Sequence, residues 1–180
     1  MLFGKEHPYD HDMSLPLYIR GPGVPAGTTL LHPTNHLDIT ATVVELAGAT
    51  SVGEPLDGKS FAGELTAPGE PAAWRGFYFT EFFGNANTWW SIRRPLPGDG
   101  TKFNHWCQND EEVFNISADA LEMTNLIASP AGAKLAASEL LIAEALGSCK
   151  GAECSAPTPA RALKKPLVCK NVTKGLGVYE

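Results

Sequence analysis

Two groupings of histidines and carboxylates have a spacing that could bind a metal. His32 and His36 are four residues apart, a spacing that places two ligands on one helix face in zinc sites. Pro33 lies between them and no third ligand is obvious nearby. We therefore interpret His32 as a loop residue and His36 as a helix-start residue near Asp38. Residues 10–12, with the sequence Asp-His-Asp, could also touch a metal, but a solvated loop is the simpler interpretation.

Other patterns exclude several familiar active sites. The glycine-containing turn at residues 21–27 follows a predicted strand, but Pro22 and Pro25 lack the N–H groups that would face a phosphate. No serine lies in a Gly-x-Ser-x-Gly elbow. Trp89 and Trp90 could stack on a sugar, yet adjacent strand residues point to opposite sides of a sheet. We therefore expect these tryptophans to pack in the core and at its edge.

Cysteines and sequons favour a secreted or lysosomal protein. Two sequons begin at Asn115 and Asn171, which we predict as glycosylation sites. The cysteines are even in number, lack C-x-x-C spacing and leave three disulfide pairings open; they are Cys107, Cys149, Cys154 and Cys169. Residues 2–7 provide no signal peptide, which suggests a missing N-terminal part. The alternative is that the sequons occur by chance and that the thiols are reduced.

Composition limits the class of protein and its partners. The 180 residues include 20 acidic and 14 basic side chains, a formal net charge of −6, and 43% are hydrophobic. This length and composition suit one globular domain, or a domain and a tail. No basic cluster exceeds a pair of residues, so a nucleic-acid partner is not expected. No apolar run approaches the roughly 18 residues of a membrane span.

The periodicity of apolar residues predicts two parts along the chain. A strand and a helix come first, with Asn35 able to cap the helix and Gly48 able to end it. Four aromatic-rich strands and a final helix follow a connector rich in proline and glycine. The strands are predicted at residues 14–20, 75–83, 88–94, 101–107 and 111–115, and the helices at residues 37–47, 59–65 and 130–146.

Short motifs spaced along residues 3–127 carry a family resemblance. They are Phe3-Gly4-Lys5, Pro8-Tyr9-Asp10, Leu15-Pro16-Leu17-Tyr18-Ile19-Arg20-Gly21-Pro22-Gly23, His36-Leu37-Asp38-Ile39, Asp57-Gly58-Lys59-Ser60, Glu112-Val113-Phe114-Asn115 and Glu122-Met123-Thr124-Asn125-Leu126. In this order they resemble the C-terminal part of sulfatases of the alkaline-phosphatase superfamily, above all arylsulfatases and N-acetylglucosamine-6-sulfatases. The chain departs from the family pattern at Asp10, Ser14 and Ala120, where Glu, Arg and Pro are usual.

The resemblance implies an α/β fold class. We expect the C-terminal portion of an alkaline-phosphatase-like sulfatase domain, followed by a small α+β subdomain with an antiparallel sheet and one helix. By this resemblance, residues 1–65 end a truncated catalytic domain and residues 66–73 are a connector. Residues 74–147 form the subdomain, and residues 148–180 are a tail that disulfides could hold in place.

The resemblance also implies a function, hydrolysis of a sulfate ester of a small molecule or sugar. The family uses a formylglycine made from the cysteine of a Cys-x-Pro-Ser-Arg motif, and none of the four cysteines begins that motif. It also uses Ca²⁺ or Mg²⁺, whose ligands lie ahead of the Gly-Lys segment and are absent from this chain. Lys5 matches the lysine that contacts the sulfate. We therefore expect a sulfatase fragment that is inactive by itself.

Two other functions stay open at this point. One is a different enzyme of the superfamily, a phosphodiesterase or a phosphonate hydrolase, which can use threonine or an unmodified cysteine as its nucleophile. The other is a non-catalytic role, either a secreted binding module or the inert product of a truncated gene.

Overall fold

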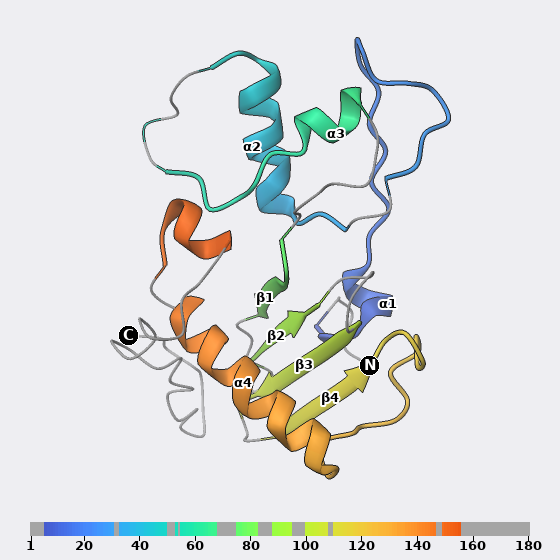
Figure 1. Ribbon diagram of the computed structural model, residues 1–180, viewed down its shortest axis with the longest axis vertical. Helices are drawn as coiled ribbons and strands as arrows, with labels where there is room; N and C mark the ends of the chain where they lie inside the picture. Colours follow the sequence, from blue (N-terminus) through green and yellow to red (C-terminus); the bar gives the residue numbers. More distant parts are fainter. Residues whose placement is uncertain are drawn as a thin grey trace. The chain divides into compact units, whose positions relative to one another are not determined.

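The structure, a computed structural model, describes residues 6–30, 33–49, 53, 55–67, 75–82, 88–94, 100–107, 110–146 and 149–155. These residues form two compact units (Figure 1). The sheet unit contains residues 6–15 and 77–146, and the helix unit contains residues 16–76 and 149–155, each within the ranges just given. Each unit is described by itself. The predicted domain boundaries stay a prediction.

The sheet unit is built on four antiparallel strands in the order β1-β2-β3-β4. Aromatic and branched side chains, which suit a pleated surface, dominate these strands. The mixed class with an antiparallel sheet and a helix, predicted from the sequence, is therefore confirmed. The elements of this unit are α1 (Asp10–Met13), β1 (Tyr78–Phe82), β2 (Trp89–Arg93), β3 (Thr101–Trp106), β4 (Glu111–Asn115) and α4 (Pro130–Leu146).

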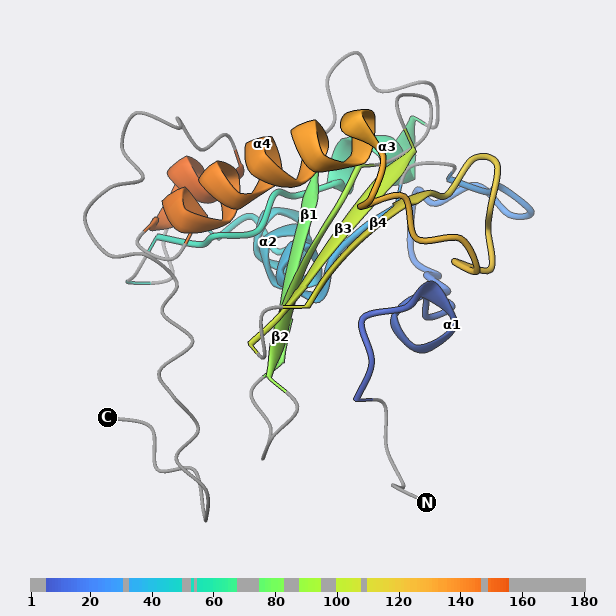
Figure 2. The same ribbon diagram turned by 90° about the horizontal axis from the view of Figure 1, so that it is seen from below.

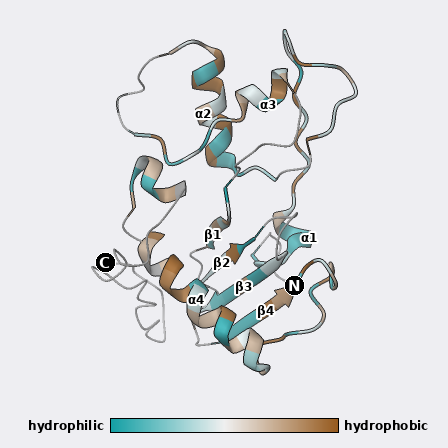
Figure 3. Ribbon diagram, in the orientation of Figure 1, coloured by the Kyte–Doolittle hydropathy of each residue, from teal (hydrophilic) through white to brown (hydrophobic). Residues whose placement is uncertain are grey.

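One face of the sheet is apolar. Ile92, Phe103 and Val113 lie opposite one another on neighbouring strands and are buried. We call the side that they share the apolar face. Helix α4 covers it, as Figure 2 shows, and contributes Ala136 and Ala143 to the core. Apart from a few hydrophilic residues, α4 is hydrophobic or neutral in Figure 3, as expected for a helix that packs on a sheet.

The opposite face of the sheet is rich in polar and aromatic side chains, and we call it the polar face. Its residues alternate along each strand with those of the apolar face. The segment of residues 6–13, which includes α1, lies on the polar face (Figure 2). The side chains of this face include Trp89, Ser91, Arg93, Lys102, Asn104, Trp106, Glu112 and Phe114.

The helix unit contains α2 (His36–Leu46), α3 (Ala62–Thr66) and a short 3₁₀ helix, η1 (Gly151–Ser155). A capping box starts α2. The Asn35 side chain accepts a hydrogen bond from the backbone amide of Asp38, and the Asp38 carboxylate accepts one from the backbone amide of Asn35. Gly48 follows the helix with a φ of 65°, the left-handed geometry that commonly ends helices. The predicted cap and stop are therefore confirmed. None of the described helices has the length and hydrophobicity that a membrane span requires.

The strand predicted at residues 14–20 is wrong. This segment is extended but belongs to no sheet among the described residues. The apolar residues alternate as expected, yet Leu15 is 49% exposed, Leu17 45% and Ile19 38%. An alternating pattern defines a strand only where another strand supplies hydrogen bonds and a core covers the apolar side. Neither condition is met for this segment within the described ranges.

Gly58 is a position in the helix unit where a side chain does not fit. A Cβ built there would overlap the carbonyl of Leu37 and lie 2.9 Å from the Asp38 nitrogen. We predict that Gly58→Ala lowers the free energy of unfolding by about 1–3 kcal/mol, because the start of α2 must shift. Gly63, in α3, faces open space and is the matched control. Gly63→Ala should leave stability unchanged or raise it by about 0.5–1 kcal/mol. Urea denaturation measures both, and equal effects would contradict the account.

Candidate functional site

The segment that follows Lys5 is held on the polar face of the sheet. Lys5 itself lies outside the described residues, which begin at Glu6. The indole nitrogen of Trp89 donates a 2.7 Å hydrogen bond to the Glu6 carbonyl. The His7 ring lies 6.2 Å from the rings of both Tyr9 and Trp106. The first described residues are therefore fixed to β2 and β3.

Glu112, on β4, accepts hydrogen bonds from three side chains. Its carboxylate receives the Tyr9 hydroxyl at 2.9 Å, the Asn104 amide at 3.2 Å and the Trp106 indole at 3.2 Å. Burial of Tyr9, together with its hydrogen bond to the Glu112 carboxylate, raises the pKa of the tyrosine hydroxyl. Tyr9 therefore stays a neutral donor and fixes its segment to β4.

Asp10, Arg93, Lys102 and Glu122 form a compact group that we call the Asp10 cluster. The Lys102 ammonium lies 2.8 Å from Asp10 and 3.1 Å from Glu122. The Arg93 guanidinium lies 3.0 Å from Asp10, and the Asp10 amide donates to Glu122 at 2.5 Å. Lys102 is only 2% exposed, and a lysine is rarely buried to this extent without such partners. Two cations and two anions thus balance one another.

Glu122 is held in an unusual backbone conformation. Its φ is 55°, and it is the one non-glycine residue with a positive φ in the described part of the chain. Such a conformation costs on the order of 1–3 kcal/mol and persists only where its surroundings enforce it. The neighbours Leu121 and Met123 are largely exposed, whereas Glu122 is buried. The strained turn therefore directs the carboxylate inward to Lys102.

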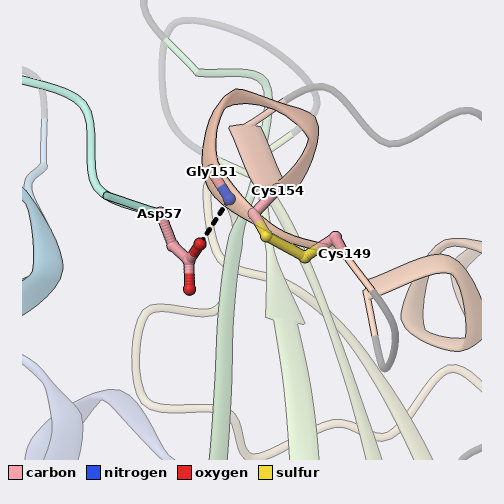
Figure 4. The surroundings of a disulfide bond; sticks show 4 residues. All are labelled: Asp57, Cys149, Gly151 and Cys154. Carbon is pink, nitrogen blue, oxygen red and sulfur yellow. Dashed lines mark hydrogen bonds between the residues drawn. A yellow bond between two sulfur atoms is a disulfide. The ribbon is translucent and has the colours of Figure 1, made fainter. Parts of the chain in front are cut away.

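Asp38 organises the helix unit in a comparable way. Its carboxylate is fully buried, pairs with the Arg75 guanidinium and accepts the Lys59 amide at 2.8 Å. The neighbouring Asp57 carboxylate accepts the Gly151 amide at 2.6 Å (Figure 4). The hydrogen bond from the Lys59 amide to Asp38 therefore joins two of the motifs behind the family resemblance, those at residues 36–39 and 57–60.

The other candidate residues have structural surroundings. His36 is an exposed residue at the start of α2, and His32 lies outside the described residues. Trp89 and Trp90 are 2 and 4% exposed, so packing rather than a sugar platform is confirmed, but the expectation that one of them lies at the edge is wrong. Within residues 10–12, Asp10 belongs to the Asp10 cluster and His11 is exposed beside Asp12. No group of three or more His, Cys, Asp or Glu side chains in the described ranges could hold a metal ion.

The cysteines and sequons are described in part. Cys149 and Cys154 form a disulfide beside the Asp57–Gly151 hydrogen bond (Figure 4). Cys107 is also disulfide-bonded. Asn115, at the end of β4, accepts the Ala118 amide at 3.2 Å with its side chain. Cys169 and Asn171 lie outside the described residues.

The sequence did not single out Lys102, Arg93 or Arg75 as important. Lys102 follows the alternation of its strand, because it lies on the polar face with Asn104 while Phe103 lies on the apolar face. A lysine in such a position is normally solvated. The sequence pattern therefore does not show that residues 6–13 cover this face and bury Lys102.

Asp10 should give the sheet unit a measurable dependence on pH. Burial favours the protonated acid, but the charges and hydrogen bonds of Lys102 and Arg93 outweigh it and lower the pKa of Asp10 below its ordinary value of 3.8. Because the pKa of Asp10 is lower in the folded chain than in the unfolded chain, its carboxylate contributes its full stabilisation of the fold at pH values above the unfolded-state pKa. This stabilisation is lost as the pH falls through the folded-state pKa.

We therefore predict that Asp10→Asn lowers the free energy of unfolding by about 1–3 kcal/mol at neutral pH. The difference from the unmodified chain should shrink once the pH falls below about 4. Urea denaturation at several pH values measures it. A difference that stays constant down to about pH 2 would show that the charge of Asp10 does not stabilise the fold.

Comparison with known proteins identifies related chains. No family model matches the sequence. The chain is 28% identical over 155 residues to a sulfatase from Metarhizium majus, covering 86% of this chain and 34% of that protein. It is 29% identical over 202 residues to an arylsulfatase from Chlamydomonas reinhardtii, covering 96% of this chain and 31% of that protein. The chain thus spans about a third of the length of these curated relatives.

The fold is also found among solved structures. A 2-O GAG sulfatase superposes with a TM-score of 0.54 at 23% identity, covering 81% of this chain and 35% of that one. At this identity the match supports the fold alone. Sequence relatives and structural neighbours agree with the resemblance predicted from the motifs. The chain is therefore related in sequence to sulfatases, a family of hydrolases, over most of its length, and its fold matches part of the fold of solved sulfatases.

Proposed function

We propose that this chain is the C-terminal part of a sulfuric ester hydrolase and that Lys5 binds the sulfate group of the substrate. The observation that carries the proposal is the likeness to a sulfatase over 86% of the chain. The position of Lys5 in the sequence supports the proposal that it binds sulfate. It immediately precedes a segment that the polar face holds through Trp89, Glu112 and the Asp10 cluster.

The role of Lys5 follows from the chemistry of the reaction. Sulfate is a compact anion, and negative charge builds on the leaving oxygen as the S–O bond breaks. An ammonium held close to these oxygens stabilises the charge, and a hydrogen bond to a charged group contributes about 1.5–3 kcal/mol. Such a group assists an activated nucleophile but does not replace one.

We propose that the nucleophile and the divalent cation of the family are supplied by residues outside this sequence. Cys107, Cys149 and Cys154 are disulfide-bonded, so none of them is a thiol that could be converted to formylglycine. The described residues contain no cluster of three His, Cys, Asp or Glu side chains that fits a metal. No step of the reaction is therefore assigned to Ca²⁺ or Mg²⁺ in this chain.

The proposed substrate is a sulfate ester of a small molecule or a sugar, and the proposed location is outside the cell or in the lysosome. The names of the relatives support the first proposal. The Cys149–Cys154 disulfide supports the second, because structural disulfides persist in oxidising compartments. In that setting Asn115 and Asn171 would carry N-linked glycans.

The activity test compares two proteins. We predict that the purified 180-residue chain hydrolyses an aryl sulfate no faster than its Lys5→Ala variant. The product of the longest native reading frame that contains the chain should hydrolyse it. Lys5→Ala should lower that activity about ten- to hundredfold, the effect of one lost charged hydrogen bond.

Three results would contradict the proposal. Hydrolysis by the short chain above its Lys5→Ala control would show that the catalytic groups lie within it. A reading frame that does not extend beyond the chain would favour a binding or degenerate role. Turnover of phosphonate or phosphodiester substrates without any of sulfate esters would favour the other enzymes of the superfamily.

A further inference from the structure

Helix α2 buries polar residues and exposes apolar ones. Asp38 and Thr42 are 0 and 3% exposed, whereas Val43 and Leu46 are 58 and 55% exposed. Ile39, Val43 and Leu46 follow one another at spacings of four and three residues, so they lie on one side of the helix. We call these three residues the α2 stripe. A surface helix normally has the opposite orientation, with its apolar stripe toward the core.

Hydrogen bonds and an ion pair hold α2 in this orientation. The Thr42 hydroxyl accepts the Phe61 amide at 3.1 Å and donates to the Asp38 carbonyl at 2.7 Å. The Asp38 carboxylate pairs with Arg75 and accepts the Lys59 amide at 2.8 Å. A rotation of α2 that buried the stripe would break these interactions and leave buried polar groups unsatisfied. The stripe can therefore be covered only by polypeptide that packs against it from outside.

Residues 16–20 of the same unit have the pattern of a strand without its pairing. They belong to no helix or strand, and they make no hydrogen bond with another residue in the described part of the chain. Leu17 and Ile19 alternate with Tyr18, which is 91% exposed. An alternating segment becomes a strand when a neighbour supplies hydrogen bonds and a core covers its apolar side. The segment therefore has the composition of a strand that lacks a partner.

Pro16 indicates which edge of this segment could pair. The backbone N–H groups of successive strand residues point to alternate edges, and proline has no N–H. Pro16 shares one edge with Tyr18 and Arg20, so that edge lacks a donor. Proline is found in sheets where its edge faces away from a neighbouring strand. The other edge carries the N–H groups of Leu17 and Ile19 and is the one suited to pairing.

We propose that residues 16–20 and the α2 stripe form a docking surface for the part of a longer native chain that lies outside this sequence. A strand of that part pairs along the edge of Leu17 and Ile19, and its apolar side chains cover the stripe. The inference rests on the proposed function, in which this chain is part of a sulfatase.

The occupant follows from the lengths and the chemistry. This chain spans 34 and 31% of the two curated relatives described above, so the remaining two thirds of such a protein are available to cover it. The surface has no charged residue in the stripe and a row of backbone donors beside it. Permanent interfaces are apolar in this way and resemble a core cut in half. The partner is therefore a covalently continuous β-sheet layer.

Hydrogen exchange compares the 180-residue chain with the product of the full native reading frame. In the short chain the amides of Leu17 and Ile19 should exchange as fast as those of an unstructured peptide, because they have no acceptor among the described residues. In the long product they should exchange about a hundredfold more slowly or better. The Tyr18 amide, on the other edge, should slow less. The ladder amides of β3 are the internal control and should be protected in both proteins.

A pair of substitutions tests the stripe. Val43→Asp places a charge in it, and Leu141→Asp makes a similar change in α4, where the side chain is 47% exposed. In the short chain both variants should keep the unmodified far-ultraviolet circular dichroism, since both carboxylates lie in water. In the long product Val43→Asp should speed exchange at Leu17 and Ile19 about tenfold or more, and Leu141→Asp should not. Val43→Thr, which keeps the shape of the side chain, repeats the test if Val43→Asp does not fold.

The results separate this inference from the proposed function. Free exchange at Leu17 and Ile19 in a long product that hydrolyses an aryl sulfate would overturn the docking surface and leave the sulfatase proposal standing. Protection in a product without hydrolysis would support the surface and contradict the activity. Protection in the short chain that rises with its concentration, together with a dimer in sedimentation, would make a second copy the occupant and overturn the inference. Equal effects of Val43→Asp and Leu141→Asp in the long product would overturn the role of the stripe.

Discussion

The buried ammonium of Lys102 is the charge on which the arrangement of the sheet unit depends. A lysine in the middle of an antiparallel sheet must find anions, because an isolated buried charge costs several kcal/mol. Asp10 and Glu122 supply them from segments that lie 92 and 20 residues away in sequence. Removing either carboxylate would leave Lys102 undercompensated. One charge therefore joins the start of the chain, the third strand and the turn after β4.

Asp38 is the corresponding buried charge of the helix unit, but it is an anion. Its carboxylate forms an ion pair with Arg75 and accepts hydrogen bonds from the backbone amides of Asn35 and Lys59. The motifs that resemble sulfatases contain Asp10, Glu122 and Asp38, and in this chain these residues anchor segments to one another. At these three residues the motifs therefore stabilise the fold of this chain. In the proposed function, Lys5 is the residue of this chain that binds the sulfate group of the substrate.

The sequence predicted the elements whose determinants are local. The cap at Asn35, the stop at Gly48 and the four aromatic strands follow from side-chain type and spacing alone. The strand at residues 14–20 failed because its alternation presupposes a neighbouring strand that the described residues do not supply. The pairing of Lys102 with Asp10 was not predictable either. The hydrophobic period and the strand propensity predict which face of the sheet a residue occupies. They do not predict which distant segment supplies the partner of a buried charge.

The central claim is that the segment after Lys5 is fixed to the sheet through the Asp10 cluster, and hydrogen exchange tests it most directly. The Asp10 amide donates to the buried Glu122 carboxylate. In the purified chain it should exchange as slowly as the ladder amides of β3, because both require the same opening of the sheet unit. An Asp10 amide that exchanges at the rate of an unstructured chain, while β3 stays protected, would show that the segment is not anchored.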